Sequence, residues 1–258
     1  MRIKSIQKAI DLFRGKKKAS QPNKVSNLDE RYTEECEIFK KLGGIITHRY
    51  PILTDYHDSA GTATGHYFHQ DLLVAQYIYE NAPQRHIDIG SRIDGFVAHV
   101  ASFRKIEILD IRDLAHSAHE NITFLKADLT ASDYVHENVT DSISCLHAIE
   151  HFGLGRYNDQ IDPAGHLKGI TNIIKMLKKG GTLYLSFPIG KGNEVHFNAH
   201  RVFKPDDVFK WQPIIDAELE FLRFDYVDDR GDLHKNTKFN EIELPNYGCG
   251  IYTFVKSN

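Results

Sequence analysis

Two polar groups rich in histidine are the densest concentration of chemically capable side chains in the chain. They comprise His147, Glu150, His151, His196 and His200. Imidazoles titrate near neutral pH, so His147, His151 and His200 are candidates for the general base that removes a proton from an acceptor hydroxyl. Imidazoles also bind divalent metals, and Glu150 keeps a metal site open as an alternative. A base is favoured because no carboxylate-rich ligand set accompanies the histidines, and Glu150 and His196 are then expected to contact the substrate.

The order His147-x-x-Glu150-His151 also matches an inverted zinc-peptidase motif. That motif needs a helix, so that both histidines lie on one face. Here the apolar run at residues 142–146 predicts a strand that leads into the group, and no further ligand is identifiable. The sequence therefore argues against a zinc peptidase.

A second chemically capable stretch is the turn within residues 86–95, His-Ile-Asp-Ile-Gly-Ser-Arg-Ile-Asp-Gly. A short apolar strand containing Asp88 meets Gly90 and runs into a helix-like segment, which is how Rossmann-like sheets bind nucleotides. The turn is irregular, because Arg92 and Asp94 stand where nucleotide-binding turns usually carry glycine. Arg92 could narrow the site or contact a ligand carboxylate.

Three residues at later strand ends complete a nucleoside site. Asp110 ends the second strand about 20 residues after the turn, where a carboxylate can accept both ribose hydroxyl hydrogens. Asp128 follows the third strand and is expected near the adenine edge, with Leu129 packed against the base. The alternative for each acid is a solvated residue at a strand end.

Two arginines could bind a phosphate or carboxylate on the acceptor, because guanidinium groups fit those anions in bidentate fashion. Arg156 lies in the glycine-containing loop at residues 153–162, and Arg201 follows His200. Either arginine could instead form a structural ion pair.

The elements that position these residues alternate from residue 86 onward. Apolar strands are predicted at residues 86–89, 106–109, 122–125, 141–146 and 182–187. Helices are predicted at residues 29–42, 66–81, 95–103 and 163–177, with a short helix after the second strand and a tight turn at residues 178–181. Alternating strands and helices indicate a parallel sheet.

Two final strands, at residues 218–228 and 250–256, have no helix between them and must pair antiparallel. This is the layout of the class I methyltransferase fold: α/β, Rossmann-like, with a mostly parallel seven-stranded sheet that ends in an antiparallel hairpin.

Composition limits the class of protein and the compartment that the chain can belong to. The chain has 258 residues, 41% hydrophobic and 26% charged, with a formal net charge of −3 that indicates no nucleic-acid partner. Three cysteines without paired spacing suggest a reducing compartment. The chain has no apolar run of about 18 residues, so we expect no membrane span. We expect a cytoplasmic protein with a basic extension and linker at 1–27, a helical or irregular cap at 28–65 and a methyltransferase-like domain at 66–258.

The first 25 residues carry eight lysines and arginines against one acid, and their isoleucines recur at helical spacing. Such a segment could lie peripherally on an anionic inner membrane surface or dock to a glycan-assembly complex. A solvated tail, or a helix packed on a partner, is the simpler alternative.

Over residues 66–256 the chain resembles class I S-adenosylmethionine-dependent methyltransferases, and more narrowly an uncharacterised bacterial family found among surface-polysaccharide biosynthesis genes. The resemblance lies in the strings His66–Asp71, Asp88–Gly95, Leu109–Arg112, Leu146–Tyr157 and Asn198–Phe203. It implies Asp88 and Gly90 at the cofactor turn and Asp110 on the ribose, but no substrate.

The leading hypothesis is therefore a methyltransferase that uses S-adenosylmethionine to O-methylate a sugar or glycan acceptor. One alternative is a metal-dependent or nucleotide-sugar-dependent transferase on the same fold. Another is a non-catalytic methyltransferase-like assembly protein.

Overall fold

The computed structural model describes residues 22–132, 134 and 136–257, in two compact units, Met1–Thr62 and Ala63–Asn258. In the first unit, helix α2 spans Pro22–Lys41 and the short 3-10 helix η1 spans Asp55–His57. Helix α2 begins seven residues before the expected start at residue 29. Proline at the first helical position explains the earlier start, because its fixed φ suits a helix and its missing N–H has no partner there.

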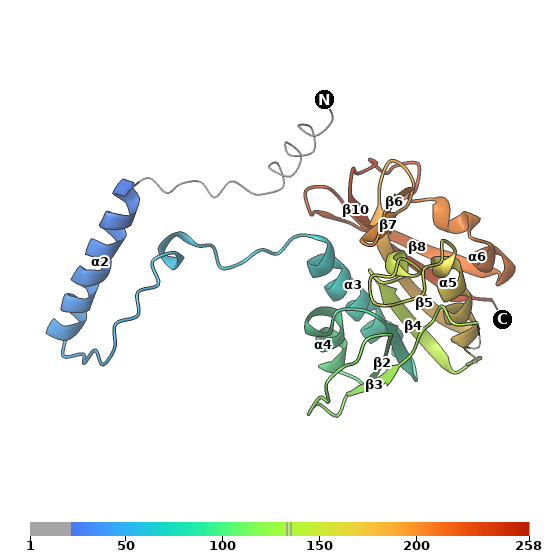
Figure 1. The fold of residues 1–258 in the computed structure, drawn as a ribbon, viewed down its shortest axis with the longest axis horizontal. Helices are drawn as coiled ribbons and strands as arrows, with labels where there is room; N and C mark the ends of the chain where they lie inside the picture. Colours follow the sequence, from blue (N-terminus) through green and yellow to red (C-terminus); the bar gives the residue numbers. More distant parts are fainter. Residues whose placement is uncertain (1–21, 133, 135, 258) are drawn as a thin grey trace. The chain divides into compact units, whose positions relative to one another are not determined.

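The second unit is built on an eight-stranded sheet with the order β3-β2-β1-β4-β5-β10-β8-β9 (Figure 1). Its strands are β1 (His86–Ile89), β2 (Ile106–Asp110), β3 (Ile122–Lys126), β4 (Thr140–Leu146), β5 (Leu177–Ile189), β8 (Leu219–Val227), β9 (Leu233–His234) and β10 (Gly248–Lys256). Strands β1 to β5 pair parallel, whereas β10 is antiparallel to both β5 and β8. The predicted α/β, mostly parallel sheet with an antiparallel end is confirmed, and β9 adds one strand at the edge.

Helices cover both faces of this sheet (Figure 1). Helices α3 (His66–Asn81) and α4 (Ala98–Ala101) lie on one side, and α5 (Gly165–Met176) and α6 (Gln212–Asp216) lie on the other. Neighbouring residues of one strand face opposite cores: Ile108 packs in the cluster that contains α3, and Leu109 in the cluster that contains α5. Burial on both faces explains why β2 carries apolar residues at neighbouring positions, such as Ile108 and Leu109.

Several local predictions need correction. The segment after the turn forms a single π-helical turn, η2 (Ile93–Val97), before α4, so it starts earlier and ends earlier than the expected helix. The described residues between β2 and β3 contain no helix. Residues 178–181 are assigned to β5, but they bulge out of its pairing with β4, with Gly180 at a φ of +72°, so the chain turns there within the strand. A hairpin of β6 (Glu194–His196) and β7 (His200–Val202) was not expected. Both strands have only three residues, and β6 is exposed at each of them, so neither carries an apolar pattern long enough to be recognised.

The order of the sheet reverses between β1 and β4, because β2 and β3 lie on one side of β1 while β4 and β5 lie on the other. Ligands of open parallel sheets bind at the carboxyl ends of the strands beside such a reversal. No helix in the described ranges is long and apolar enough to cross a membrane. The basic segment predicted at residues 1–25 lies almost wholly outside the described residues.

Candidate functional site

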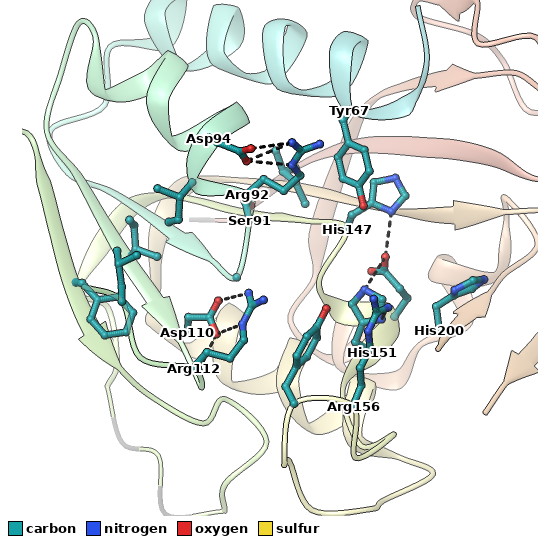
Figure 2. Close-up of a pocket in the computed structure, with 18 of the residues that line it drawn as sticks. Tyr67, Ser91, Arg92, Asp94, Asp110, Arg112, His147, His151, Arg156 and His200 are labelled. Atoms are coloured by element: carbon teal, nitrogen blue, oxygen red, sulfur yellow. Dashed lines mark hydrogen bonds and ion pairs between the residues drawn. The ribbon is translucent and has the colours of Figure 1, made fainter. Parts of the chain in front are cut away.

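Two neighbouring cavities lie at the carboxyl ends of β1, β2 and β4, and Figure 2 shows residues that line the larger one. The larger has a volume of about 660 Å³ and the smaller about 60 Å³. Both are lined by Gly90, Asp110, Arg112, His147, His151 and Tyr157. The predicted turn and the first histidine group therefore share one site.

The turn after β1 requires glycine at position 90. Gly90 has a φ of +68°, and a Cβ atom there would lie 3.1 Å from the Cβ of Ala148. Its N–H donates to the carbonyl oxygen of Leu109 at 3.0 Å, which ties the turn to β2. The backbone can therefore pass close to a ligand at the carboxyl end of β1.

Asp88 supports this turn from beneath and lines neither cavity. Its carboxylate is fully buried and accepts hydrogen bonds from Ser91 N at 3.0 Å, Ser91 Oγ at 2.6 Å and Ser144 Oγ at 2.6 Å. Burial raises the pKa of Asp88 to about 6, although these hydrogen bonds favour the charged form. The structure thus places Asp88, a predicted cofactor ligand, where it shapes the turn.

Arg92 lines the larger cavity, as expected from its place in the turn. Its Nη2 lies 3.1 Å from Asp94 Oδ2, and its guanidinium carbon lies 4.8 Å from the ring centre of Tyr67. The two residues that replace the usual glycines therefore form an ion pair at one wall, beside Tyr67 (Figure 2).

Asp110 ends β2 and faces both cavities. Both of its carboxylate oxygens accept hydrogen bonds from Arg112, which also stacks over Tyr157 with 4.4 Å from its guanidinium carbon to the ring centre. Asp128 and Leu129 line only the smaller cavity. Asp128 is partly occupied in its own turn, because its Oδ1 accepts hydrogen bonds from the amide and hydroxyl of Thr130.

The first histidine group is organised around a buried carboxylate. Glu150 Oε1 lies 3.0 Å from His147 Nδ1 and 3.6 Å from His151 Nε2. Burial disfavours charge on His147, but Cys249 and Glu150 outweigh it and raise the pKa of His147 well above its usual value. Burial raises the pKa of Glu150, but its hydrogen bond to His147 outweighs this effect, so the pKa of Glu150 is lowered. His147 and Glu150 therefore form a buried ion pair.

His151 has a fixed orientation. Its Nδ1 donates a hydrogen bond to the carbonyl oxygen of Ala199 at 2.7 Å, so the proton of the neutral ring resides on Nδ1 and Nε2 is free to accept one. Arg156 Nη1 donates to the same carbonyl at 3.0 Å. Burial lowers the pKa of His151, which keeps the ring neutral near pH 7.

The second histidine group is divided by the β6–β7 hairpin. His200 lines the larger cavity, and burial lowers its pKa. His196 pairs across the hairpin with His200, is exposed, lies 2.7 Å from Glu194 through its Nε2, and lines neither cavity. Of the two predicted histidines, the structure brings only His200 to the site.

Arg201 also lies away from the cavities, contrary to the expectation of an anion ligand. Its buried guanidinium donates to the carbonyl oxygens of Glu150, Phe152 and Pro163, at 3.3, 2.7 and 3.2 Å. These three hydrogen bonds tie β7 to the loop after β4, which gives the arginine a structural role. Arg156 remains at the cavity.

Sequence reasoning missed an aromatic wall. His66 stacks on His147 with ring centres 5.6 Å apart, and on Tyr247 at 5.5 Å, while Tyr247 lies 5.5 Å from His200. Desolvation lowers the pKa of His66 to about 4. These residues come from the start of α3 and the segment before β10, so only the folded sheet brings them together. The one signal in the sequence was the polar, aromatic start of the helix, His66-Tyr67-Phe68-His69.

A metal site was the alternative for the histidines. Among the residues that the structure describes, no group of three or more histidine, cysteine, aspartate or glutamate side chains is arranged to hold a metal ion.

Comparisons with known proteins agree with this architecture. Residues 98–207 match the model of a family described as a Caenorhabditis protein of unknown function, DUF268. That description names neither an activity nor a bacterial polysaccharide pathway. No curated protein sequence matches the chain.

Solved structures show the fold. An N1-methyltransferase of Burkholderia thailandensis, with bound 1,6-didemethyltoxoflavin and S-adenosylhomocysteine, is 11% identical with a TM-score of 0.53, and the alignment covers 93% of this chain and 92% of that chain. The [4+2]-cyclase SpnF is 13% identical with a TM-score of 0.54, covering 72% and 81%. An N-methyltransferase of Haemonchus contortus, in complex with phosphomonomethylethanolamine and S-adenosylhomocysteine, is 15% identical with a TM-score of 0.51, covering 78% and 56%.

The chain therefore has the Rossmann-like class I methyltransferase fold. Because a cyclase shares this fold with methyltransferases, the reaction must be argued from the site itself.

Proposed function

We propose that this protein is an S-adenosylmethionine-dependent methyltransferase that O-methylates a hydroxyl of a sugar or glycan acceptor, in bacterial surface-polysaccharide synthesis. One observation carries the cofactor assignment. The Gly90 turn and the Asp110 carboxylate lie at the ends of adjacent parallel strands and line both cavities. A nucleoside can therefore bind between them, with its other end directed toward the histidines.

The residues present fit this cofactor. A Cβ at position 90 would close the backbone cradle, Asp110 offers both oxygens to ribose hydroxyls, and Leu129 supplies a buried apolar wall for a base. Arg92 is suited to the carboxylate of the methionine moiety, because its ion pair with Asp94 engages Nε and Nη2 and leaves Nη1 as a charged donor for the ligand.

Bound S-adenosylmethionine supplies an electrophilic methyl group on a sulfonium. The chain must bring the acceptor hydroxyl into line with that methyl and remove its proton. His151 is the best base, since its Nδ1–H is held by Ala199 and its Nε2 accepts a proton. The Glu150 carboxylate, 3.6 Å from Nε2, stabilises the imidazolium that results.

The acceptor assignment rests on the larger cavity and on the family resemblance. Polar side chains there alternate with the rings of Tyr67, Tyr157 and Tyr247. Such a wall suits a ligand that combines hydroxyl groups with apolar ring faces, as a sugar does. A cavity of about 660 Å³ has room for an acceptor beside the cofactor.

Isothermal titration of the full chain with S-adenosylhomocysteine tests the cofactor assignment. We expect binding to the unmodified protein and a loss of at least about tenfold in Asp110→Asn, since hydrogen bonds to a charged group contribute about 1.5–3 kcal/mol. Asp216→Asn, on the exposed end of α6, is the matched control and should bind as the unmodified protein does. Absence of binding to the folded, unmodified chain would refute the proposal.

A second experiment tests the acceptor. Methyl-labelled S-adenosylmethionine is incubated with the protein and a panel of nucleotide sugars and glycans, and products are analysed by mass spectrometry. Transfer to a hydroxyl oxygen gives a methyl ether that resists mild alkali, whereas transfer to a carboxylate oxygen gives a methyl ester that is hydrolysed. Label recovered only in esters or amines would contradict O-methylation of a hydroxyl.

A further inference from the structure

The charges that line the larger cavity pair off almost completely. Three ion pairs lie within the lining: Arg92 with Asp94 at 3.1 Å, Arg112 with Asp110 at 2.5 Å, and His147 with Glu150 at 3.0 Å. The fourth lining carboxylate, Asp113, pairs at 2.9 Å with Lys126, which does not line the cavity. Each carboxylate of the wall has a cationic partner within this set. None is left to neutralise a further cation.

Arg156 is the cation that remains. Within the described part of the chain, no carboxylate lies within ion-pair distance of its guanidinium, which contacts only neutral groups. Its Nη1 donates to the carbonyl oxygen of Ala199, and its guanidinium carbon lies 5.2 Å from the ring centre of Tyr157. The side chain is therefore held in place while its charge and its other donors stay available.

The other ionisable side chains of the wall do not alter this balance. Burial lowers the pKa of both His151 and His200, so these rings are neutral near pH 7. Among the described lining residues, Arg156 is therefore the cation without a carboxylate partner, and it lies beside His151.

This charge is not placed for the cofactor. The turn after β1 carries Arg92 beside Tyr67, and Figure 2 shows Arg156 on the opposite side of the cavity, next to His151. A carboxylate held at the turn and an anion held at Arg156 therefore belong to different parts of the bound molecules.

We propose that the acceptor is an anionic sugar whose carboxylate or phosphate binds the guanidinium of Arg156, which sets its hydroxyl against His151. This proposal rests on the proposed function and narrows its substrate class. A guanidinium matches both anions in bidentate geometry. An unpaired positive charge in a cleft also attracts anionic ligands and rejects neutral competitors. Uronic acids and sugar phosphates share this chemistry.

The test uses the full chain saturated with S-adenosylhomocysteine and titrated with three probes: glucose, glucuronate and glucose 1-phosphate. We expect at least one anionic probe to bind about tenfold or more tightly than glucose, and which one binds identifies the anion. Arg156→Gln should abolish this preference, and Arg156→Lys should keep part of it, because the charge remains while the fork is lost. Arg49→Gln, an exposed arginine of the first unit, is the control that should leave it unchanged.

The outcomes separate this inference from the proposed function. If the unmodified chain fails to bind S-adenosylhomocysteine, the proposed function itself is wrong. If the cofactor product binds equally to the unmodified chain and to Arg156→Gln, only the acceptor class is at issue. The inference is then overturned if neither anionic probe binds, if glucose binds as tightly, or if the anionic preference survives in Arg156→Gln.

Discussion

The carboxylate of Asp110 and the guanidinium of Arg112 are joined through both oxygens, with Nε 2.9 Å from Oδ1 and Nη2 2.5 Å from Oδ2 (Figure 2). The backbone N–H of Arg112 also donates to Oδ1, at 2.8 Å. The plane of the carboxylate is therefore set by its own chain before a ligand arrives. Its remaining lone pairs are the ones available to ribose hydroxyls.

Replacing Arg112 by alanine tests how much of this orientation comes from the side chain. The backbone hydrogen bond stays, so we expect affinity for S-adenosylhomocysteine to fall by less than about tenfold, and by less than in Asp110→Asn. Stability should change by no more than about 1 kcal/mol, because the arginine is half exposed. Titration calorimetry and urea denaturation measure the two effects. A loss of affinity equal to that of Asp110→Asn would mean that the arginine is itself a ligand.

The buried carboxyl of Asp88 predicts a dependence of stability on pH. Its pKa is about 6 in the folded chain against a usual value of 3.8, so the folded state binds more protons than the unfolded state between these values. Stability should therefore fall as pH rises from about 4 to about 6, by roughly 3 kcal/mol for this group.

Denaturation of the unmodified chain and of Asp88→Asn at pH 4 and pH 7 measures this contribution. The unmodified chain should lose roughly 3 kcal/mol relative to the variant between the two pH values. Asp216→Asn serves as the control and should follow the unmodified chain. An unchanged difference between unmodified protein and Asp88→Asn at the two pH values would show that Asp88 is ionised throughout.

The buried pair of His147 and Glu150 predicts a contribution to stability that is lost at both high and low pH. The pKa of His147 is raised, so its contribution is full below 6.5 and is lost as pH rises through the folded value. The pKa of Glu150 is lowered, so its contribution is full above 4.5 and is lost as pH falls through the folded value. The pair therefore stabilises the fold most between these two reference values.

Glu150→Gln removes the counter-ion and leaves His147 buried. At pH 6 we expect the variant to be less stable by roughly 3 kcal/mol, the usual cost of breaking a buried pair. The pKa of His147 should also fall, because burial still disfavours its charged form. Denaturation and histidine NMR titration report the two effects. The exposed pair of Glu194 and His196 offers a control: Glu194→Gln should change neither the stability of the chain nor the pKa of His147. A His147 pKa unchanged in Glu150→Gln would place the stabilising charge elsewhere.

The sequence predicted the sheet well because parallel strands are buried on both faces. Strand β5 is buried from Leu183 to Ile189, and all of these residues except Ser186 are apolar, so its character is visible without the fold. The β6 strand is exposed at every residue, and its pairing depends on the loop geometry, which no periodicity reports. Buried strands could therefore be predicted from their apolar residues, whereas an exposed strand such as β6 could not.

The site was predictable only where chemistry follows directly from a strand end. Gly90 and Asp110 end adjacent strands, and both line the cavities as expected. Arg156 and Arg201 have the same chemistry in sequence, yet burial among three carbonyls removes Arg201 from the site. Tyr247 and His66 are 181 positions apart and meet only through tertiary packing, so no local pattern could place them together.

Gly153 begins the loop that carries Arg156, and its backbone cannot accommodate a side chain. Its φ is +78°, and a Cβ would lie 2.0 Å from the carbonyl oxygen of Asp162. Its own carbonyl accepts a hydrogen bond from the N–H of Asp162 at 2.9 Å, so the two segments cannot separate without losing that bond. If a side chain were added at Gly153, the loop would have to absorb strain from both the positive φ and the overlap.

Gly153→Ala should therefore destabilise the chain by about 2 kcal/mol or more. It should also weaken binding of the anionic probes more than that of S-adenosylhomocysteine, because the displaced loop carries Arg156. Gly192→Ala is the matched control: no atom lies within 4 Å of the added Cβ, so stability should change little. Urea denaturation and calorimetry of both variants measure these effects. Equal stability of the two variants would show that the loop can relax around an alanine, and Arg156 would then owe its position to Ala199 and Tyr157 alone.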